Sequence, residues 1–411
     1  MGMIVLASPI FNSNMSVEAY RFSSKNYEDL LSFRPDKSEN RDVVNPKMLS
    51  MIEEIGLDAI SSSLPILMQV NIITLMAEFK LDVPPEKVIF NVESEVGNEK
   101  IYLDRINELK QRGYKFSLTL SQNAAENEKV APYMNYIVVD KNISNKKQAI
   151  EFMERLKAKG LTITFIANNV NGYHMFNLSK ITGYKLFEGR FYHIPSNLES
   201  SPSTPLKALS LELINVVNRK DFELEEVSNI IIRDPMISIS LLRYINSQKF
   251  GQKINSITHA VALLGQKEVV RWVNVSGTTA LASNKPTALS RLALIRAKFA
   301  ENLAAVFGLS EESYSIFLMG LFSVLDVILD QDIKSALESL SISEEIYDAL
   351  VLEEGPYRDL YKFLIAYEGA NWSELARFSV LKNINLEKAS EAYISTIKWY
   401  KETLDLLEEQ A

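Results

Sequence analysis

The first half of the chain alternates short apolar runs with stretches of helical periodicity. The apolar runs, and then the helical stretches between them, occupy residues 66–71, 88–92, 115–120, 136–140 and 161–167, and residues 47–60, 99–112 and 146–159. Strands and helices that alternate at this spacing form parallel βαβ units, and this number of units favours a sheet closed into a barrel. Two earlier apolar runs, at residues 4–7 and 17–22, predict a hairpin ahead of the first unit.

A serine- and proline-rich segment follows, and after it the sequence has only helical periodicity. Residues 196–205, SNLESSPSTP, lack an apolar period, which is typical of a linker. Helical patterns then follow one another to residue 407, and one of them predicts a continuous helix at residues 312–329. The sequence therefore predicts an N-terminal α/β TIM-like barrel in residues 1–195, a linker at residues 196–205 and an all-α domain in residues 206–411.

The all-α domain has its most specific sequence at residues 234–272. Asp234 offers an N-cap oxygen and Pro235 suits the first position of a helix, so a helix should begin there. Asn246 ends that helix, and Gly251 turns the chain toward a second helix that Gly265 closes. A third helix follows at once, and three short helices must pack into a larger helical domain to bury their apolar faces.

The motifs of this stretch resemble the HDOD domain, a helical relative of the HD phosphohydrolases. They read R-D-P, L-L-R-x-x-N-S, F-G, I-x-S-I-x-H-A, L-L-G and R-W, in that order. The parent superfamily holds metals with several histidines and an adjacent His-Asp pair, but His259 is followed by Ala260 and the chain has no His-Asp pair. The resemblance implies structural roles for its characteristic residues, which are Asp234, Pro235, Asn246, Gly251, His259 and Gly265.

Four motifs in the first half resemble the EAL family of cyclic di-GMP phosphodiesterases, in the shortened form that is fused to HDOD domains. They are A-S-P-I-F-N at residues 7–12, P-P-E-K-V-I at 84–89, G-Y-K-F-S-L at 113–118 and G-Y-K-L-F-E-G-R-F-Y-H-I-P at 183–195. The last is similar to the family's closing G-F-x-x-x-Q-G-Y-x-x-x-x-P. Together the two resemblances cover nearly the whole chain and imply a bacterial EAL–HDOD signalling protein.

The EAL resemblance implies a site at the carboxyl ends of the strands, where carboxylates and an asparagine hold divalent metals that activate water. Arg21 stands where the family's first strand carries a glutamate ligand, and Asn71 matches the family's ligand asparagine. Asn91 replaces the glutamate of the next strand, and Thr119 and Leu120 replace a pair of aspartates. Losing several oxygen ligands leaves no site for hard cations.

The remaining strands depart from the family in the same way. Val138 stands at the family's strand lysine, Asn168 and Asn171 stand at two glutamates, and Glu188 replaces a glutamine of the closing loop. We therefore predict a degenerate barrel with no catalytic residues, no bound metal and no cofactor. The polar residues left at the rim form a candidate vestigial ligand site: Arg21, Asn71, Asn91, Asn168, Asn171 and Glu188.

Two side chains allow a functional and a structural interpretation. Arg21 could hold an anionic ligand with both guanidinium nitrogens, or it could pair with a neighbouring carboxylate such as Glu93. Asp326, a lone carboxylate in an apolar helix, could be a vestigial metal ligand or a group hydrogen-bonded to nearby backbone or to an arginine. We favour the structural interpretation in both cases.

Composition and charge narrow the chemistry further. The absence of cysteine excludes disulfides and thiolate nucleophiles, and the three histidines are too few for a histidine-rich metal site in the second half. The net charge of −8 lies mostly in the second half, which argues against binding to a phosphate backbone. A helix-turn-helix interpretation of the central helices would offer only Lys267 and Arg271 as cations, so we predict no nucleic-acid partner.

These observations favour a cytoplasmic signal-transduction protein that is not an enzyme. No apolar run is long enough to span a bilayer, so no membrane partner is expected. We expect the barrel and the HDOD domain to act as surfaces that bind other signalling proteins, and the sequence leaves a homodimer open. The first alternative is a sensor that binds a cyclic di-GMP-like nucleotide at the rim without hydrolysing it. The second is an active phosphodiesterase.

Overall fold

The computed structural model divides the chain into two compact units. It describes residues 3–26, 30, 43–44, 52–53, 55–78, 83–97, 99–121, 124–140, 146–194, 205–247, 254–338 and 340–408. One unit, the barrel unit, comprises Met1–Ile194 and Ile365–Lys398. The other, the helical unit, comprises Pro195–Leu364 and Trp399–Ala411. Each unit is built from two separate stretches of the chain.

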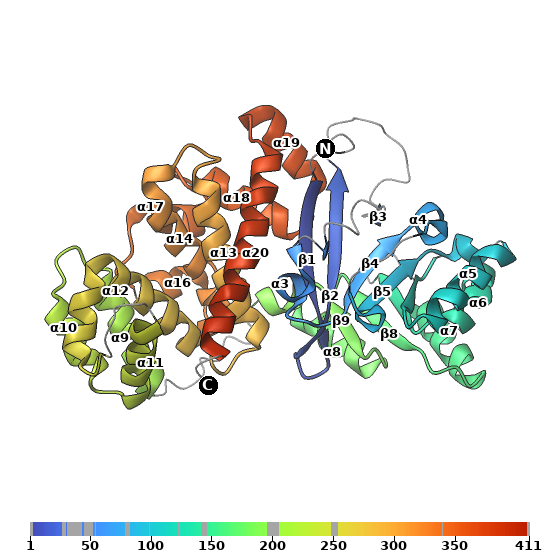
Figure 1. The fold of residues 1–411 in the computed structure, drawn as a ribbon, viewed down its shortest axis with the longest axis horizontal. Helices are drawn as coiled ribbons and strands as arrows, with labels where there is room; N and C mark the ends of the chain where they lie inside the picture. The colour runs from blue at the N-terminus through green and yellow to red at the C-terminus, as the bar shows by residue number, and fades with distance from the viewer. Residues whose placement is uncertain are drawn as a thin grey trace. The chain divides into compact units, whose positions relative to one another are not determined.

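The barrel unit has the predicted α/β barrel (Figure 1). The sheet runs in the order β2-β1-β9-β8-β7-β6-β5-β4-β3, and a further pairing of β2 with β4 closes it. β1 is antiparallel to β2 and to β9, whereas the neighbours from β2 through β4 round to β9 pair in parallel. The strands are β1 Met3–Asn12, β2 Val17–Asn26, β3 Val43–Val44, β4 Ile66–Val70, β5 Val88–Val92, β6 Lys115–Thr119, β7 Tyr136–Asp140, β8 Thr164–Asn168 and β9 Leu186–Glu188.

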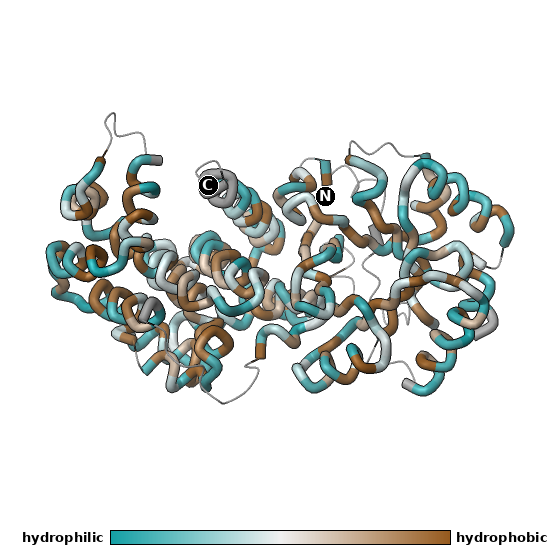
Figure 2. The backbone as a smooth tube through the Cα atoms, turned by 90° about the horizontal axis from the view of Figure 1, so that it is seen from below, coloured by the Kyte–Doolittle hydropathy of each residue, from teal (hydrophilic) through white to brown (hydrophobic). Residues whose placement is uncertain are grey.

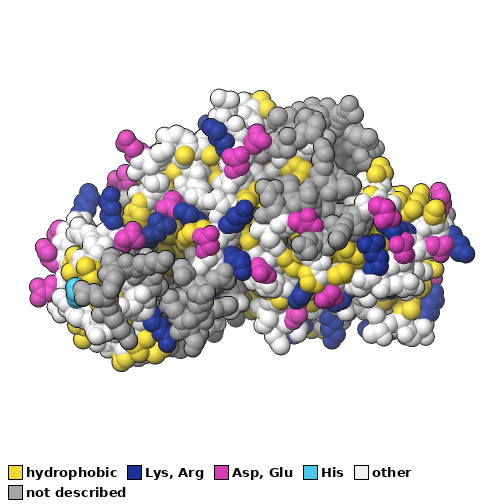
Figure 3. All heavy atoms as spheres, in the orientation of Figure 1, with side chains coloured by type: hydrophobic (Ala, Val, Ile, Leu, Met, Phe, Trp, Pro, Cys, Tyr) yellow, Lys and Arg dark blue, Asp and Glu magenta, His cyan; other side chains and the backbone are white. Residues whose placement is uncertain are grey.

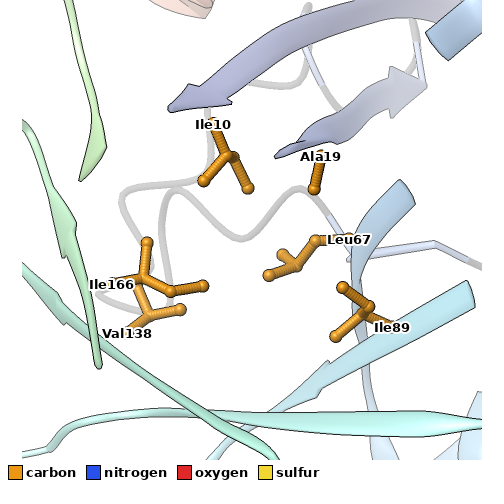
Figure 4. Packing of buried hydrophobic residues seen from close by; sticks show 6 residues of the cluster. All are labelled: Ile10, Ala19, Leu67, Ile89, Val138 and Ile166. Atoms are coloured by element: carbon orange, nitrogen blue, oxygen red, sulfur yellow. The ribbon is translucent and has the colours of Figure 1, made fainter. Parts of the chain in front are cut away.

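Apolar side chains from alternate positions of the strands fill the inside of the barrel. The cluster shown in Figure 4 comprises Ile10, Ala19, Leu67, Ile89, Val138 and Ile166. These six side chains come from six different strands and point toward one another, because each lies on the face of its strand that is turned to the inside of the closed sheet. Burying one large aliphatic side chain contributes about 2 kcal/mol, so this cluster is a main source of the barrel's stability.

Helices connect the strands as the βαβ pattern predicts. α5 Lys100–Gln111 buries Ile106 and Leu109, so its apolar stripe faces inward. The predicted helix at residues 47–60 lies partly outside the described residues, and its described end is α3 Leu57–Ser61. The other helices of this half are α4 Ile72–Met76, α6 Ala124–Val130, α7 Lys146–Ala158 and α8 Tyr173–Ile181. Short η1 Pro85–Lys87, η2 Ser94–Gly97, η3 Ala131–Tyr133 and η4 Phe191–His193 complete the connections.

The helical unit contains the predicted helices. They are α9 Pro205–Val217, α10 Leu224–Ile231, α11 Pro235–Ser247, α12 Ile257–Leu281, α13 Thr287–Ala304, α14 Ser313–Phe322, α15 Leu325–Leu329, α16 Ile333–Glu338 and α17 Glu344–Tyr347, with η5 Ser310–Glu312 and the π-helical η6 Asp348–Leu352. α12 has a break at Gly265, where φ is 71° and ψ is 170°, so the predicted end of a helix at this glycine is confirmed.

The continuous helix predicted at residues 312–329 is instead two helices, α14 and α15. At the break the Ser323 hydroxyl donates to the Gly320 carbonyl at 2.7 Å and stands in for a helical bond. Gly320 lies against the backbone of Arg296 on α13, since a Cβ at this glycine would be 2.5 Å from the Arg296 carbonyl oxygen. Close packing of α14 on α13 therefore coincides with the interruption, and the apolar pattern alone did not reveal it.

The end of the chain belongs to a different unit from the one predicted. We expected residues 206–411 to form one helical domain, but Ile365–Lys398 clusters with the barrel unit. This segment contains α19 Trp372–Lys382 and parts of α18 Arg358–Glu368 and α20 Leu386–Glu408. An amphipathic pattern predicts a buried face but not the element that covers it. The predicted linker at 196–205 lies outside the described residues except for Pro205.

The distribution of hydrophobic residues agrees with this fold in each unit. Figure 2 shows hydrophobic segments on the strands and on the inner sides of the helices, with hydrophilic segments outside. Within the part of the chain that the structure describes, no helix is both long enough and apolar enough to cross a membrane.

Candidate functional site

A polar layer lies directly above the apolar cluster inside the barrel. Two residues beyond Leu67, Ile89 and Val138 come Gln69, Asn91 and Asp140. The same step leads from Ala19 to Arg21, from Ile166 to Asn168 and from Leu186 to Glu188. Side chains two apart on a strand share a face, so this layer occupies the end of the barrel where the parallel strands finish. That end is where barrel enzymes carry their active sites.

Arg21 and Glu188 form a bidentate ion pair in this layer. Arg21 Nε donates to Glu188 Oε1 at 2.6 Å and Nη2 donates to Oε2 at 2.8 Å. The side chains are only 16% and 9% exposed, so little water screens the pair. Arg21 is on β2 and Glu188 is on β9, and β1 lies between these strands in the sheet. We expected Arg21 to pair with a neighbouring carboxylate such as Glu93. The carboxylate of Glu188, which the barrel's closure brings near, forms such a pair.

A second group of polar side chains surrounds Asn91 on the three adjacent strands β4, β5 and β6. Asn91 is 1% exposed, and its amide nitrogen donates to Thr119 Oγ1 at 2.7 Å and to the Gln69 side-chain oxygen. Its amide oxygen accepts from Ser117 Oγ at 2.8 Å. The apolar pattern of the strands did not predict Gln69 and Ser117 as neighbours of Asn91. Strand pairing of Gln69 with Asn91 and of Asn91 with Ser117 is the signal that could have found them.

The other residues predicted at the rim make local hydrogen bonds. Asn71 caps α4 by accepting the backbone N–H of Thr74 at 2.8 Å. Asn168 accepts the backbone N–H of Asn169 at 2.7 Å, and Asn171 accepts that of Arg190 at 3.3 Å. The structure therefore brings Arg21 and Glu188 together. Asn71 and Asn168 instead bond to backbone groups of their own loops, and Asn171 bonds to the backbone of the closing loop after β9.

The donor set of the polar layer does not fit a pair of divalent metals. Hard cations need several carboxylate, carbonyl or water oxygens arranged around one point. Glu188 already gives both carboxylate oxygens to Arg21, and Asn91 has both ends of its amide engaged by Gln69, Ser117 and Thr119. Among the described residues, no three His, Asp or Glu side chains converge on a possible metal position. We therefore derive no metal-dependent step at this rim.

In the helical unit, the residues of the HDOD motif lie at helix ends. Asp234 Oδ1 accepts the backbone N–H groups of Met236 and Ile237 at 2.8 and 3.0 Å, and Pro235 begins α11. Asn246 donates to the carbonyl of Ile254 and accepts its N–H, both at 2.8 Å, which ties the end of α11 to the start of the next segment.

The other motif residues frame the next helix. Ser256 caps α12 by accepting the backbone N–H of His259 at 3.4 Å, so it is the peptide group of His259 and not its imidazole that makes this bond. The His259 side chain is exposed. Gly265 supplies the break in α12, and Gly251 lies outside the described residues.

Arg271, one of the two cations considered for a nucleic-acid surface, forms an ion pair in the helical unit. Arg271 donates to both carboxylate oxygens of Glu301, at 2.9 and 3.2 Å, and its guanidinium lies 4.5 Å from the centre of the Phe317 ring. Burial raises the pKa of Glu301, but hydrogen bonds from Arg271 and Lys298 outweigh it and lower the pKa overall. On the face seen in Figure 3, basic and acidic side chains are interspersed. Arg271 thus stabilises the core of the helical unit.

Asp326 is a largely buried carboxyl group on α15. Burial raises its pKa, and the nearby charge of Arg296 and local backbone hydrogen bonds lower it by less. Its Oδ1 has no hydrogen-bond partner, although it is buried. Arg296 donates to Ser323, to the hydroxyl at 3.0 Å and to the carbonyl at 3.3 Å. Asp326 is therefore a buried acid whose charged form the fold disfavours.

Comparison with known proteins gives a family for part of the second half and relatives for most of the chain. Residues 204–343 match the HDOD domain. The chain is 25% identical over 328 residues to the cyclic di-GMP phosphodiesterase CdgJ of Vibrio cholerae, a match that covers 79% of this chain and 76% of CdgJ. It is 23% identical over 416 residues to the uncharacterized protein YuxH of Bacillus subtilis, covering 98% of this chain and 100% of YuxH.

A solved structure resembles part of the chain more distantly. BlrP1 of Klebsiella pneumoniae, in a complex with manganese and cyclic di-GMP, matches 46% of this chain at 15% identity and a TM-score of 0.37. The match covers 55% of the BlrP1 chain. A TM-score this low adds nothing to the barrel described above from its own strand pairing.

Proposed function

We propose that this chain, which joins an EAL-like barrel to an HDOD domain, is a non-catalytic signal-transduction protein that acts by binding other proteins. The observation that carries the proposal is the Arg21–Glu188 pair at the end of the barrel where the resemblance implies metal-binding carboxylates. A fixed guanidinium repels divalent cations and neutralises the carboxylate beside it. The barrel then lacks the means to activate water for phosphodiester hydrolysis.

One further observation supports a binding role. The barrel and the HDOD domain both keep packed cores, and a fold can persist as a binding surface after its catalytic site has gone. The name of CdgJ assigns phosphodiesterase activity to that relative. At 25% identity most aligned residues differ between the two chains, so the activity in the name of CdgJ is not by itself evidence that this chain is active.

A hydrolysis assay tests the non-catalytic part of the proposal. The purified protein is incubated with cyclic di-GMP and either magnesium or manganese, with CdgJ as the positive control, and the nucleotides are separated by chromatography. We expect the cyclic dinucleotide to remain intact. A linear product from the wild-type protein that disappears in a Glu188→Gln variant would contradict the proposal, because it would make Glu188 part of an active site.

A protein-binding experiment tests the other part. The full chain, tagged and immobilised, is used to capture proteins from a bacterial lysate, and each captured protein is then purified and titrated against the full chain. We expect at least one saturable complex. Failure of every purified candidate to bind, together with hydrolysis in the assay above, would overturn the proposal.

The second candidate function is a sensor that binds a cyclic dinucleotide without cleaving it. The observation that favours it is the polar layer itself, because Arg21 keeps 16% of its side chain exposed and could contact a phosphate. Calorimetric titration with cyclic di-GMP, with and without magnesium, distinguishes the two. Our proposal predicts no heat of binding, whereas a signal that Arg21→Ala abolishes would establish the sensor.

A further inference from the structure

The barrel closes at a short seam. β1 pairs with β9 over only three residues, with Ile10 opposite Glu188, Phe11 opposite Phe187 and Asn12 opposite Leu186. On its other side β1 pairs with β2 along nearly its whole length, from Met3 to Phe11. The first part of β1 therefore extends beyond the reach of β9 and has one edge that no described strand of the barrel pairs.

An uncovered strand edge exposes backbone N–H and C=O groups to pairing with other chains. Successive residues of a strand direct these groups to opposite edges, so Met3, Val5 and Ala7 present theirs to the same edge. Buried backbone groups need hydrogen-bond partners, and leaving one without a partner costs about 1–3 kcal/mol. The backbone groups on this edge of β1 therefore need hydrogen-bond partners from elsewhere in the chain.

Side chains from the end of the sequence supply these partners. The Tyr367 hydroxyl, on α18, donates to the carbonyl of Val5 at 2.9 Å. On α20, the Ser390 hydroxyl donates to the carbonyl of Met3 at 2.6 Å, and the Tyr393 hydroxyl accepts the N–H of Ala7 at 3.3 Å. Met3, Val5 and Ala7 thus each bond to a side chain that lies more than 350 positions later in the sequence.

These contacts are part of a buried surface. Tyr367 and Tyr393 are 0% and 4% exposed, and their ring centres are 5.1 Å apart. Leu375 on α19 is fully buried within the same segment. Figure 1 shows α18 and α20, in orange-red and red, beside β1, in dark blue.

We propose that Ile365–Lys398 is the closing element of the barrel, which covers the edge of β1 where β9 falls short. Arg21 and Glu188 join β2 to β9 across β1 on the inside of the same seam. The barrel unit therefore needs both ends of the sequence, and the HDOD domain is inserted between them. The inference does not depend on whether the barrel binds a nucleotide or a protein.

Hydrogen exchange measured by NMR or mass spectrometry on the full-length protein tests this inference. Tyr393→Phe removes the acceptor of the Ala7 N–H, and the triple variant Tyr367→Phe, Ser390→Ala and Tyr393→Phe removes all three bonds. We expect exchange in the Met3–Ala7 part of β1 to become about tenfold faster or more in the triple variant. Exchange in α12 of the helical unit should stay at the wild-type rate. Ser395→Ala, at an exposed serine on the same helix, is the matched control and should change neither.

Two cavity variants, one in each segment, test which unit the closing element stabilises. Leu375 and Leu337 are both fully buried leucines, the first in the closing element and the second on α16 of the helical unit. Leu375→Ala should accelerate exchange throughout the barrel strands and spare α12, and Leu337→Ala should do the reverse. Unchanged exchange of β1 in the triple variant would overturn the inference. Equal acceleration of β1 and α12 by Leu375→Ala would also overturn it, because the segment would then belong to the helical unit.

Discussion

At the scale of single residues, Arg21 and Glu188 show that polar side chains at the end of the barrel can contribute to its stability. A carboxylate and a guanidinium with little exposure stabilise each other only as long as both are present. Removing one leaves the other charged in a poorly hydrated place. Asn91, with Gln69, Ser117 and Thr119, meets the same requirement with neutral groups, so every hydrogen bond in that group can form without a charge.

The Arg21–Glu188 pair gives a prediction about stability. Glu188→Gln should destabilise the barrel unit by about 3 kcal/mol, because it removes the charge that pairs with a little-exposed guanidinium. Replacing both residues by methionine should restore most of this loss, since a well-packed apolar pair often substitutes for a buried ion pair. Denaturant unfolding of the two variants and the wild type measures this difference.

A surface pair provides the comparison. Arg155 bonds to Glu128 at 3.0 Å, with side chains that are 45% and 32% exposed. Arg155→Ala should cost no more than about 1 kcal/mol because water screens this pair. If Glu188→Gln lowered the free energy of unfolding as little as Arg155→Ala does, the Arg21–Glu188 pair would not stabilise the barrel more than a surface pair.

Asp326 gives a prediction about pH. Burial raises the pKa of its folded form above the ordinary aspartate value, so the folded state binds its proton more tightly than the unfolded state does. The stability it contributes is complete below the unfolded pKa and is lost as the pH rises through the folded pKa. Asp326→Asn should therefore raise the free energy of unfolding at neutral pH by about 1 kcal/mol and flatten its decline above about pH 4. Thermal unfolding across pH 4–8 checks this, with the exposed Asp104→Asn as a neutral control.

At the scale of secondary-structure elements, local chemistry set most of the boundaries. The N-cap oxygen of Asp234, Pro235 at the first turn and the break at Gly265 act within a few residues of the helix that they delimit. The break between α14 and α15 does not depend on nearby residues alone. It coincides with the approach of Gly320 to the backbone of α13. A boundary that depends on a neighbouring helix cannot be read from the pattern of one helix.

Gly265 gives a prediction at this scale. Its φ of 71° and ψ of 170° lie in a region that is essentially restricted to glycine, although no atom within 4 Å would clash with a Cβ. Gly265→Ala should therefore destabilise the helical unit by about 1–3 kcal/mol through backbone strain alone. The exposed neighbour Lys267→Ala should change the free energy of unfolding by less than about 0.5 kcal/mol. Equal effects of the two variants in denaturant unfolding would show that the break is not strained.

At the scale of the whole molecule, the path of the chain decides how the two units are connected. The sequence suggests that the linker at residues 196–205 is a single hinge. The chain instead passes between the units at three points, after Ile194, after Leu364 and after Lys398. The chain therefore connects the two units at three points and not at the linker alone.

Cutting the linker tests this connectivity. A protease site placed within residues 196–204 of the full chain allows a single cut, which leaves Ile365–Lys398 in the larger fragment. We expect the two fragments to remain together in size-exclusion chromatography at physiological salt and to separate only in denaturant. Separation without denaturant would mean that the linker alone joins the two halves.

Patterns in the sequence were sufficient to predict the two fold classes and most element boundaries. These features depend on periodicity, capping and motifs, which act over short distances along the chain. Three features could be seen only once the chain had folded: Arg21 pairs with Glu188, Asn91 is surrounded by Gln69, Ser117 and Thr119, and Ile365–Lys398 covers β1. An amphipathic helix needs a cover for its apolar face, and many surfaces can supply one. Which surface does so depends on the closure of the barrel, which joins residues from the two ends of the chain.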